Sequence, residues 1–401
     1  MKTALVTVLG RAVYDPRTGY RRARYRFPDG TVVESSFFGL DLCRKLQPHR
    51  LVVVGTGGSS WHLLAERLPE ASDANAWLDL HEAAAQGVVR PTQIAALEKD
   101  AAGHFAPECR LLLVGTGLDP SDPVDTLATL AQASRGVEHI ALDVTHGLRH
   151  LPMLLLAGAA YLRRIRPELR SIEIWYGALE LRDGEGIAPV LRLDGLTRIL
   201  AWVEALAAFD HSGDYAVIAE HLEEEGFDRE LADLLRGAAH DEAVLRLESA
   251  RQRIARFLDH LGGGLPGVGQ LFLRALRARL SWAHREHLFE HQRKLAFQAL
   301  ARGDFLRAAV LGFEAVVSRD LGPHEASCRE ARARARSRIE GEVADLDPAH
   351  PWRRAYHRLR RIRNTLAHGE PGGSRSLDPL LADPKRLRKA MEQDLHRLLD
   401  S

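Results

Sequence analysis

Cysteine is scarce in this chain of 401 residues: only Cys43, Cys109 and Cys328 occur, and they lie far apart. Their odd number and wide spacing exclude a disulfide framework and a cysteine zinc site. Long apolar runs are also missing, because every such run, including 151–160 with its Pro152, is too short to cross a bilayer. The first ten residues show no leader pattern. We therefore expect a cytoplasmic protein without a membrane partner.

Lysine is rare as well, at six of the 55 basic residues, so arginine carries nearly all of the positive charge. The net charge is only +1, and the molecule as a whole lacks the positive field that is typical of nucleic-acid-binding proteins. Two local groups of arginine stand apart, namely Arg11, Arg17, Arg21, Arg22, Arg24 and Arg26 near the start and Arg353, Arg354, Arg358, Arg360, Arg361 and Arg363 near the end. Each group can either meet phosphates or simply be solvated.

The first half of the chain alternates short apolar runs with helix-like stretches, which is the pattern of a parallel sheet covered by helices. We expect the strands at 3–9, 51–54, 111–114, 139–143 and 171–175. Two hairpins are expected in addition, the first from 25–27 and 31–34 around an Asp-Gly turn, the second from 178–182 and 189–193. The first half is therefore predicted to be a Rossmann-like, doubly wound α/β fold.

The second half has a different character. From about Leu196 the β-branched strands stop, and alanine, leucine, arginine and glutamate follow in helical spacing to the end of the chain. The fold class is thus predicted as α/β followed by all-α.

Three of the expected strands end in loops that enter helices. The loops are Gly55-Thr56-Gly57-Gly58-Ser59-Ser60, Gly115-Thr116-Gly117 and Val144-Thr145-His146-Gly147. In an open α/β sheet such loops meet at the carboxyl edge, where helix N-termini bind anions. None carries a Walker lysine or a complete dinucleotide fingerprint, so ATP hydrolysis and NAD chemistry are unsupported. The candidate ligand contacts are Gly10, Arg11, Gly55, Thr56, Gly57, Gly58, Ser59, Ser60, Trp61, Gly115, Thr116, Thr145, His146 and Gly147.

Two of these candidates have a second interpretation. His146 can bind a phosphate or ribose, or it can be a solvated loop histidine. Trp61 can fill the core at the start of a helix, or it can stack on a base.

The strongest local motif lies in 359–369, where a helical pattern stops at Gly369. On one helix, Arg363 lies about 140° around the axis from His368, so the two side chains of one chain cannot easily reach the same substrate atom. A second copy packed about a two-fold axis would form a shared cleft. Histidine suits proton transfer and arginine suits phosphate stabilisation, so such a cleft fits RNA cleavage without a metal. Alternatively, the histidine merely complements the helix dipole.

Two weaker signals accompany this motif. The spacing of His284, His287 and His291 with Glu290 allows a metal, but a solvated or packing cluster is the favoured interpretation and no metal site is expected. Glu314, in the apolar stretch 308–317, can either orient the arginine of the motif or hold two helices together.

Over most of its length the chain resembles the CARF-HEPN ribonucleases, which are ancillary nucleases of type III CRISPR systems. In the sensor half the resemblance rests on 4–10, 25–27, 54–61 and 143–149. In the helical half it rests on Arg363-Asn364 through Ala367-His368, which matches the HEPN pattern of arginine, four residues and histidine.

This resemblance implies a CARF-like ligand-sensing domain at 1–194, a helical linker region at 195–290 and a HEPN ribonuclease domain at 291–401. It also implies a homodimer or higher oligomer, in which a cyclic oligoadenylate, the tetra- or hexa-adenylate, acts as allosteric activator and no cofactor is needed. Arg363 and His368 are then catalytic and Asn364 supports them. Some relatives slowly cleave their own activator, and the pair Thr145 and His146 allows that ring nuclease activity here.

The expected function is a metal-independent endoribonuclease that is activated by cyclic oligoadenylate in antiviral defence. It would cut single-stranded RNA and leave 2′,3′-cyclic phosphate and 5′-hydroxyl ends. The alternative is a sensor of the same ligand without catalysis, which would bind a protein or nucleic-acid partner through its helical half.

Overall fold

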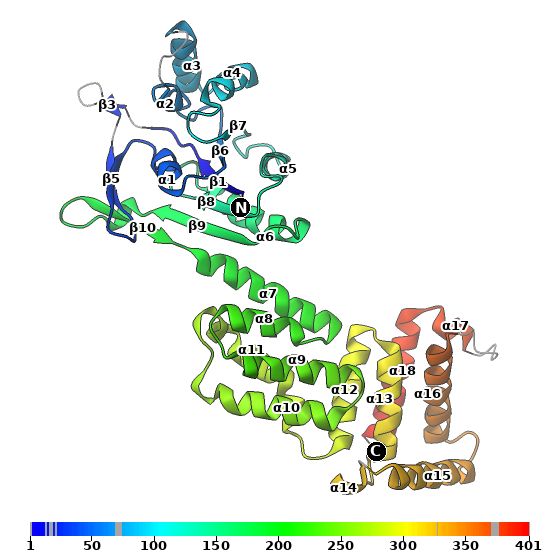
Figure 1. Cartoon of the computed structure of the whole chain (residues 1–401). Coiled ribbons are helices and arrows are strands. Elements are labelled where there is room, and N and C mark those ends of the chain that lie inside the picture. The colour runs from blue at the N-terminus through cyan, green and yellow to red at the C-terminus, as the bar shows by residue number, and fades with distance from the viewer. Residues whose placement is uncertain are drawn as a thin grey trace. The chain divides into compact units, whose positions relative to one another are not determined.

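The computed structural model describes residues 2–12, 14–15, 19–20, 22–68, 74–326, 328–369 and 377–400. The chain divides into two compact units, Met1–Leu200 and Ala201–Ser401 (Figure 1). The first unit holds the large sheet and the second is helical.

The centre of the first unit is a run of five parallel strands. In spatial order they are β9 (Ser171–Gly177), β8 (His139–Asp143), β1 (Thr3–Val8), β6 (Arg50–Gly55) and β7 (Glu108–Leu113). The register places Val6 of β1 beside Val52 of β6 on one side and beside Leu142 of β8 on the other. All five strands expected from the apolar runs are therefore confirmed.

Three further strands make the sheet mixed rather than parallel. They are β10 (Ile187–Arg192), which is antiparallel to β9, β4 (Ala23–Arg26), which is parallel to β10, and β5 (Val32–Ser35), which is antiparallel to β4. The hairpin predicted around the Asp-Gly turn is confirmed as β4 and β5. A short separate pair consists of β2 (Tyr14–Asp15) and β3 (Gly19–Tyr20).

Of the second predicted hairpin, the strand at 189–193 is confirmed within β10, but the strand at 178–182 is wrong. Residues Leu179–Leu181 form a 3-10 turn, and the antiparallel partner of β10 is β9, which runs on to Gly177. Asp183 closes the connection, because its Oδ1 accepts the amide N–H groups of Glu185 at 3.0 Å and Ile187 at 2.9 Å.

Helices cover both faces of the sheet, as expected for a doubly wound fold. On one face, Leu5, Leu51 and Val53 pack against α1 (Phe38–Leu46), α2 (His62–Ala65), α3 (Ala74–Gln86) and α4 (Pro91–Ala101). On the other face, Val6 and Val52 pack against α5 (Asp122–Ala133) and α6 (His150–Ile165). Neighbouring residues of one strand thus enter different cores, which explains the nearly continuous apolar runs of these strands.

The second unit is built from helices alone among its described residues, as the sequence predicts. α7 (Asp194–Ser212) leads into it, and it continues with α8 (Ala216–Glu224), α9 (Arg229–Ala243), α10 (Leu247–His260), α11 (Leu273–Leu280), α12 (Leu288–Arg302), α13 (Phe305–Ser318), α14 (Pro323–Ala326), α15 (Arg329–Asp345), α16 (Pro351–His368), α17 (Asp378–Leu381) and α18 (Pro384–Leu399). In the described part of the chain, no helix is long and apolar enough to span a membrane.

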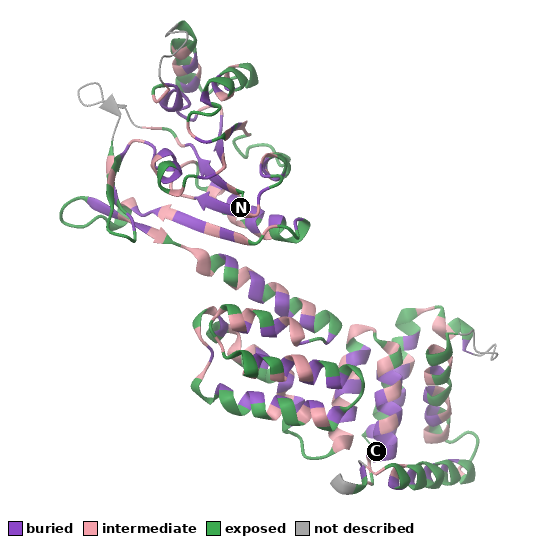
Figure 2. Ribbon diagram, in the orientation of Figure 1, coloured by how far each residue is buried: buried purple, intermediate pink, exposed green. Residues whose placement is uncertain are grey.

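Helix α13 is the apolar centre of this C-terminal group, and most of its side chains are buried (Figure 2). It is joined to α12 by a tight turn in which Gly303 takes φ +86° and the Asp304 carboxylate caps the next helix by accepting from the amide of Arg307. Helices α16 and α18 both pack on α13. The position of α16 therefore depends on α13 and α18 together.

One buried ion pair ties α16 to α18. The guanidinium of Arg358 donates to both oxygens of Asp394 at 2.7 and 2.6 Å, and the Asp394 side chain is fully buried. Burial raises the pKa of Asp394, while Arg358 opposes that rise. Such a bidentate pair specifies geometry as well as contributing energy.

We predict that Asp394→Ala lowers the free energy of unfolding by about 3 kcal/mol, because it leaves a partly buried arginine without its partner. Urea denaturation followed by circular dichroism measures this change. The matched control is Asp320→Ala, which removes the exposed partner of Arg338 at 3.0 Å and should cost less than about 1 kcal/mol. Equal effects of the two variants would contradict this account of the pair.

Candidate functional site

The carboxyl ends of β1, β6 and β8 meet at one rim of the sheet. The amide of Ser60, in the loop after β6, donates to the carbonyl of Gly10 after β1 at 3.0 Å. Gly10 also lies directly against the loop after β8, since a Cβ on Gly10 would stand 2.9 Å from the backbone nitrogen of Gly147. Gly147 itself has φ +96°, a conformation that glycine adopts readily. The structure thus brings two of the three predicted loops, 55–60 and 144–147, together around Gly10.

The serine hydroxyl groups in the loop after β6 form hydrogen bonds that hold the loop in its conformation. Ser59 Oγ donates to the Leu9 carbonyl at 2.7 Å and accepts from the amide of Thr56 at 2.9 Å. Ser60 Oγ accepts from the amide of Ala12 at 2.9 Å. The side chains of Thr56, Ser59 and Ser60 are buried, so a ligand would meet the backbone of this loop at Gly57 and Gly58, which are partly exposed.

Trp61 occupies the core and not the surface of the rim. Its ring is fully buried, its indole N–H donates to the Thr56 carbonyl at 2.9 Å, and a Cβ on Gly55 would lie 2.6 Å from the ring. The structure therefore agrees with the interpretation of Trp61 as a core residue and offers no ring face for stacking on a base. Gly55 is needed because the ring packs against its backbone.

The loop after β8 is held by a buried carboxylate. Asp143 accepts from the Thr7 hydroxyl at 2.6 Å and from the amide of Thr145 at 3.0 Å. The Thr145 hydroxyl oxygen accepts from the amide of Gly177 at 2.8 Å. Burial raises the pKa of Asp143. These contacts fix the loop to β1 and β9 before any ligand arrives.

His146 is neither a free base nor a solvated loop residue in this structure. Its Nε2 accepts from the amide of Phe38, at the start of α1, at 3.3 Å. Burial lowers the pKa of His146, against the opposing effect of Asp143, so we assign the neutral imidazole with its proton on Nδ1. Because Nε2 is already occupied, the contact favours a role in joining α1 to the rim over proton abstraction from an activator.

The loop after β7 is exposed and carries its own negative charge. A Cβ on Gly115 would stand 2.0 Å from a carboxylate oxygen of Asp122, and the amide of Gly117 donates to Asp122 Oδ2 at 2.8 Å. Thr116 is exposed between them. Since a carboxylate of the chain already binds this loop, Gly115 and Thr116 are the least suited of the candidates to receive a phosphate.

Arg11 is exposed just beyond the end of β1, with one long contact from Nη2 to the Ala85 carbonyl at 3.4 Å. Of the other members of the first arginine group, Arg17 and Arg21 lie outside the described residues. Arg26 is engaged with Asp183 at 3.0 Å. Among the described arginines of this group, Arg11 directly follows Gly10 and so lies next to the glycine loops.

The motif of the helical half lies at the end of α16. This helix begins with Pro351 at its first position and buries Ala355, Leu359 and Ile362, which follow helical spacing. It stops at Gly369, which takes φ +65°. The predicted helix and its end are therefore confirmed.

Arg363 is held in place by two neighbours. Its Nε and Nη2 donate to Asn364 Oδ1 at 3.1 and 2.8 Å, and its guanidinium carbon lies 4.2 Å from the ring centroid of Phe313 on α13. Burial lowers the pKa of Arg363, while Glu314 opposes this effect; the group stays a cation. The contribution of Phe313 was missed from the sequence, where it is one of many apolar residues in α13.

His368 is the last residue of α16 and its side chain is exposed. It makes no hydrogen bond or ion pair with another residue in the ranges that the structure describes. Five residues along an α-helix correspond to about 7.5 Å along the axis and about 140° of rotation. Arg363 and His368 of one chain therefore point in different directions, as the sequence predicts.

Glu314 holds helices together. It accepts from Arg332 and, at 3.0 Å, from Arg336, both on α15. Of the two alternatives for this residue, the structure agrees with the one that links helices, because Arg363 is instead oriented by Asn364 and Phe313.

Of the histidines near α12, only His291 is buried, and His284 and His287 are exposed. His291 is fully buried and its Nε2 is 2.8 Å from the Arg285 carbonyl, while His284 ends a 3-10 turn and His287 precedes α12. Within the described ranges, no group of three histidine, cysteine or acidic residues is arranged to hold a metal.

Comparisons with known proteins bear on the sequence resemblance. No family model matches the chain. Over 264 residues the chain is 25% identical to CRISPR-associated protein MJ1674 of Methanocaldococcus jannaschii. The aligned region covers 60% of this chain and 38% of that protein. A solved structure of Enterococcus italicus Csm6 bound to cyclic hexa-2′-fluoro-hexa-dAMP aligns at 12% identity and TM-score 0.40, over 100% of this chain and 94% of that one.

The chain spans well under half the length of the curated relative that it matches. The aligned part nevertheless covers more than half of this chain. This match agrees with the resemblance drawn from the motifs, since the chain is similar to a CRISPR-associated protein.

Proposed function

We propose that the protein is a metal-independent endoribonuclease of type III CRISPR defence that is activated by a cyclic oligoadenylate. The observation that carries this proposal is the arrangement at the end of α16, where Arg363 is held by Asn364 and Phe313 and an exposed His368 follows on the same helix. A cation with a fixed position and a solvent-accessible imidazole are the two groups that phosphodiester transfer needs.

The chemistry follows from these side chains. An imidazole of His368 takes the proton of a 2′-hydroxyl, and the 2′-oxygen attacks the adjacent phosphorus. The bond to the 5′-oxygen breaks, and this oxygen receives a proton from an acid. Arg363 stabilises the negative charge that builds on the phosphoryl oxygens. The products are a 2′,3′-cyclic phosphate and a 5′-hydroxyl, and no metal takes part.

Two chains are required, because Arg363 and His368 of one helix diverge by about 140°. Pairing of two α16 ends about a two-fold axis would place an arginine and a histidine from each chain in one cleft. The proposed enzyme is therefore a homodimer or a higher oligomer of dimers.

The first unit carries a surface that suits this pairing. Met153, Ala157, Tyr161 and Ile165 are exposed at intervals of four residues and form an apolar stripe along α6; Met153 is 73% exposed. α6 begins three residues after Gly147, so the stripe starts next to the rim. An exposed apolar stripe of this kind is typical of an interface, and a two-fold axis along it would place two rims beside one another.

In that dimer the cyclic oligoadenylate would lie across the two rims. Backbone amides of Gly57, Gly58 and Gly147 and the guanidinium of Arg11 are the partly exposed or exposed groups that can meet its phosphates. The tetra- and hexa-adenylate are the expected ring sizes.

The competing proposal is a regulator that senses the same ligand without cutting RNA. It predicts ligand binding without any RNA cleavage. The well-positioned Arg363 favours catalysis.

The first prediction concerns RNA cleavage. Purified protein is mixed with labelled single-stranded RNA in EDTA, with and without cyclic tetra- or hexa-adenylate. We expect cleavage only with an activator, a loss of about 10²-fold or more in His368→Ala and Arg363→Ala, and a loss of about tenfold in Asn364→Ala.

The matched control for this assay is Arg361→Ala, which removes an exposed arginine of the same helix and should keep full activity. Cleavage without activator, or undiminished cleavage by His368→Ala, would refute the proposal. Ligand binding without cleavage would favour the regulator.

The second prediction concerns the activator site. A panel of cyclic oligoadenylates is titrated while thermal stability is followed. A ligand present at a hundred times its dissociation constant should add about 2.7 kcal/mol to the free energy of unfolding. Arg11→Ala should weaken binding by about tenfold, since it removes a charged contact to phosphate. The control Arg24→Ala changes an exposed arginine of β4. Equal affinity in the two variants would remove Arg11 from the site.

The third prediction concerns assembly. Met153→Glu places a charge in the middle of an interface on α6 and should turn the dimer into a monomer in sedimentation velocity. Leu181→Glu, which changes an apolar residue that is 61% exposed elsewhere on the unit, should leave the dimer intact. If both variants keep the mass of the unmodified protein, the stripe is not the interface.

A further inference from the structure

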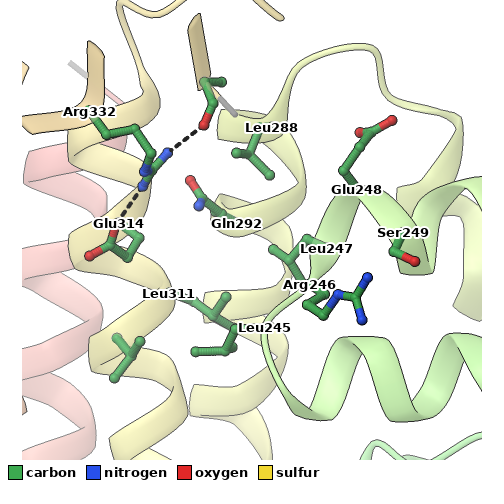
Figure 3. A pocket seen from close by; sticks show the side chains of 12 residues that line it. Leu245, Arg246, Leu247, Glu248, Ser249, Leu288, Gln292, Leu311, Glu314 and Arg332 are labelled. Atoms are coloured by element: carbon green, nitrogen blue, oxygen red, sulfur yellow. Dashed lines mark hydrogen bonds and ion pairs between the residues drawn. The ribbon is translucent and has the colours of Figure 1, made fainter. Parts of the chain in front are cut away.

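A cavity of about 800 Å³ lies among the helices of the second unit (Figure 3). It is bounded by the start of α10, by α12 and α13, and by Ala326 of α14 and Arg332 of α15. Its apolar wall consists of Leu245, Leu247, Leu288, Val310 and Leu311. The volume is in the range of small-molecule and nucleotide sites, and nothing in the proposed cleavage reaction uses it.

Gln292, which lines this cavity, carries an acceptor without a partner. Gln292 on α12 is only 6% exposed, and its Oε1 is buried without a hydrogen-bond partner among the described residues. Figure 3 shows its amide between Leu288 and Arg332. Because buried polar atoms in native proteins are nearly always paired, this oxygen indicates a ligand that brings a hydrogen-bond donor.

Hydrogen-bond donors, in contrast to the Gln292 acceptor, are found at the start of α10, whose first residues also line the cavity. The N-cap residue Arg246 makes no side-chain capping bond, so the first amides of the helix need other acceptors. The helix has 14 residues, and its N-terminus carries partial positive charge. This end of the cavity is suited to an anionic group.

The charged side chains that line the cavity are Arg246, Arg332, Glu248 and Glu314. Glu248 is held by Arg251, and Glu314 by Arg332 and Arg336, so neither lining carboxylate is left without a cation. Arg246 is the most loosely held of them, since it is 68% exposed and lies 3.6 Å from Asp241. It can turn to a phosphate without leaving a carboxylate unpaired.

Leu245 adds an apolar contact at a strained position. Its backbone takes φ +62°, which is rare for leucine, and its side chain lines the cavity while remaining partly exposed.

We propose that this cavity binds one nucleotide. The amino group of the base donates to Gln292 Oε1, the ring lies against Leu288 and Leu311, and the phosphate meets the first turn of α10 and Arg246. The nucleotide is either a free mononucleotide or one unit of single-stranded RNA, which share this chemistry. The inference does not rest on catalysis by Arg363 and His368.

The test is a calorimetric titration of the full chain with adenosine 5′-monophosphate. We expect saturable binding, and binding about tenfold weaker to purine riboside 5′-monophosphate, which lacks the amino group. Gln292→Leu should weaken binding of adenosine monophosphate by about tenfold without lowering thermal stability, because it removes an unpaired buried oxygen. Gln298→Leu on the same helix lies outside the cavity lining and should bind normally.

A photoaffinity label locates the site, since the first unit has a rim of its own. 8-Azidoadenosine 5′-monophosphate should crosslink to peptides that contain 245–249 or 288–292. Competition by a short single-stranded RNA would identify RNA as the natural source of the bound nucleotide. A lack of competition would identify the free nucleotide as the ligand. His368→Ala should bind like the unmodified protein, so a failure of the cleavage proposal leaves this result intact. No saturable binding, labelling confined to the first unit, or equal binding by Gln292→Leu and Gln298→Leu would overturn the proposal.

Discussion

The contact between α16 and α13 is the constraint on which the helical unit depends. The apolar residues of α16 face α13 with helical spacing, and Phe313 of α13 lies under the guanidinium of Arg363. The buried pair Arg358 and Asp394 then fixes α16 against α18. Burial of apolar surface sets the distance between the helices, and the ion pair selects one rotation of α16 about its axis. Arg363 has a defined position because both conditions hold.

The rim of the sheet is held mainly by hydrogen bonds of buried polar side chains. Its side-chain hydroxyls and the Asp143 carboxylate are consumed by hydrogen bonds within the first unit. What is left for a ligand is backbone at glycines, together with Arg11. A site of this kind is shaped before it is filled, so little ordering entropy would be lost on binding.

Much of the fold could be predicted from the sequence, since apolar runs and helical spacing report burial directly. The five parallel strands and the end of α16 at Gly369 are examples. The partner of β10 could not be predicted, because the sequence does not show that β9 continues to Gly177 and pairs with β10. At the candidate site, residue types were informative but contacts were not: the ring of Phe313 under Arg363 comes from a helix that lies far from Arg363 in the sequence.

Helix α13 contributes residues both to the cavity and to the support of Arg363. Leu311 and Glu314 border the cavity, while Phe313, between them in sequence, supports the guanidinium of Arg363. A helix moves largely as a rigid rod, so a displacement that widens or narrows the cavity also shifts the aromatic platform beneath the cation. A ligand in the cavity would therefore be coupled, through one turn of α13, to the orientation of the Arg363 guanidinium.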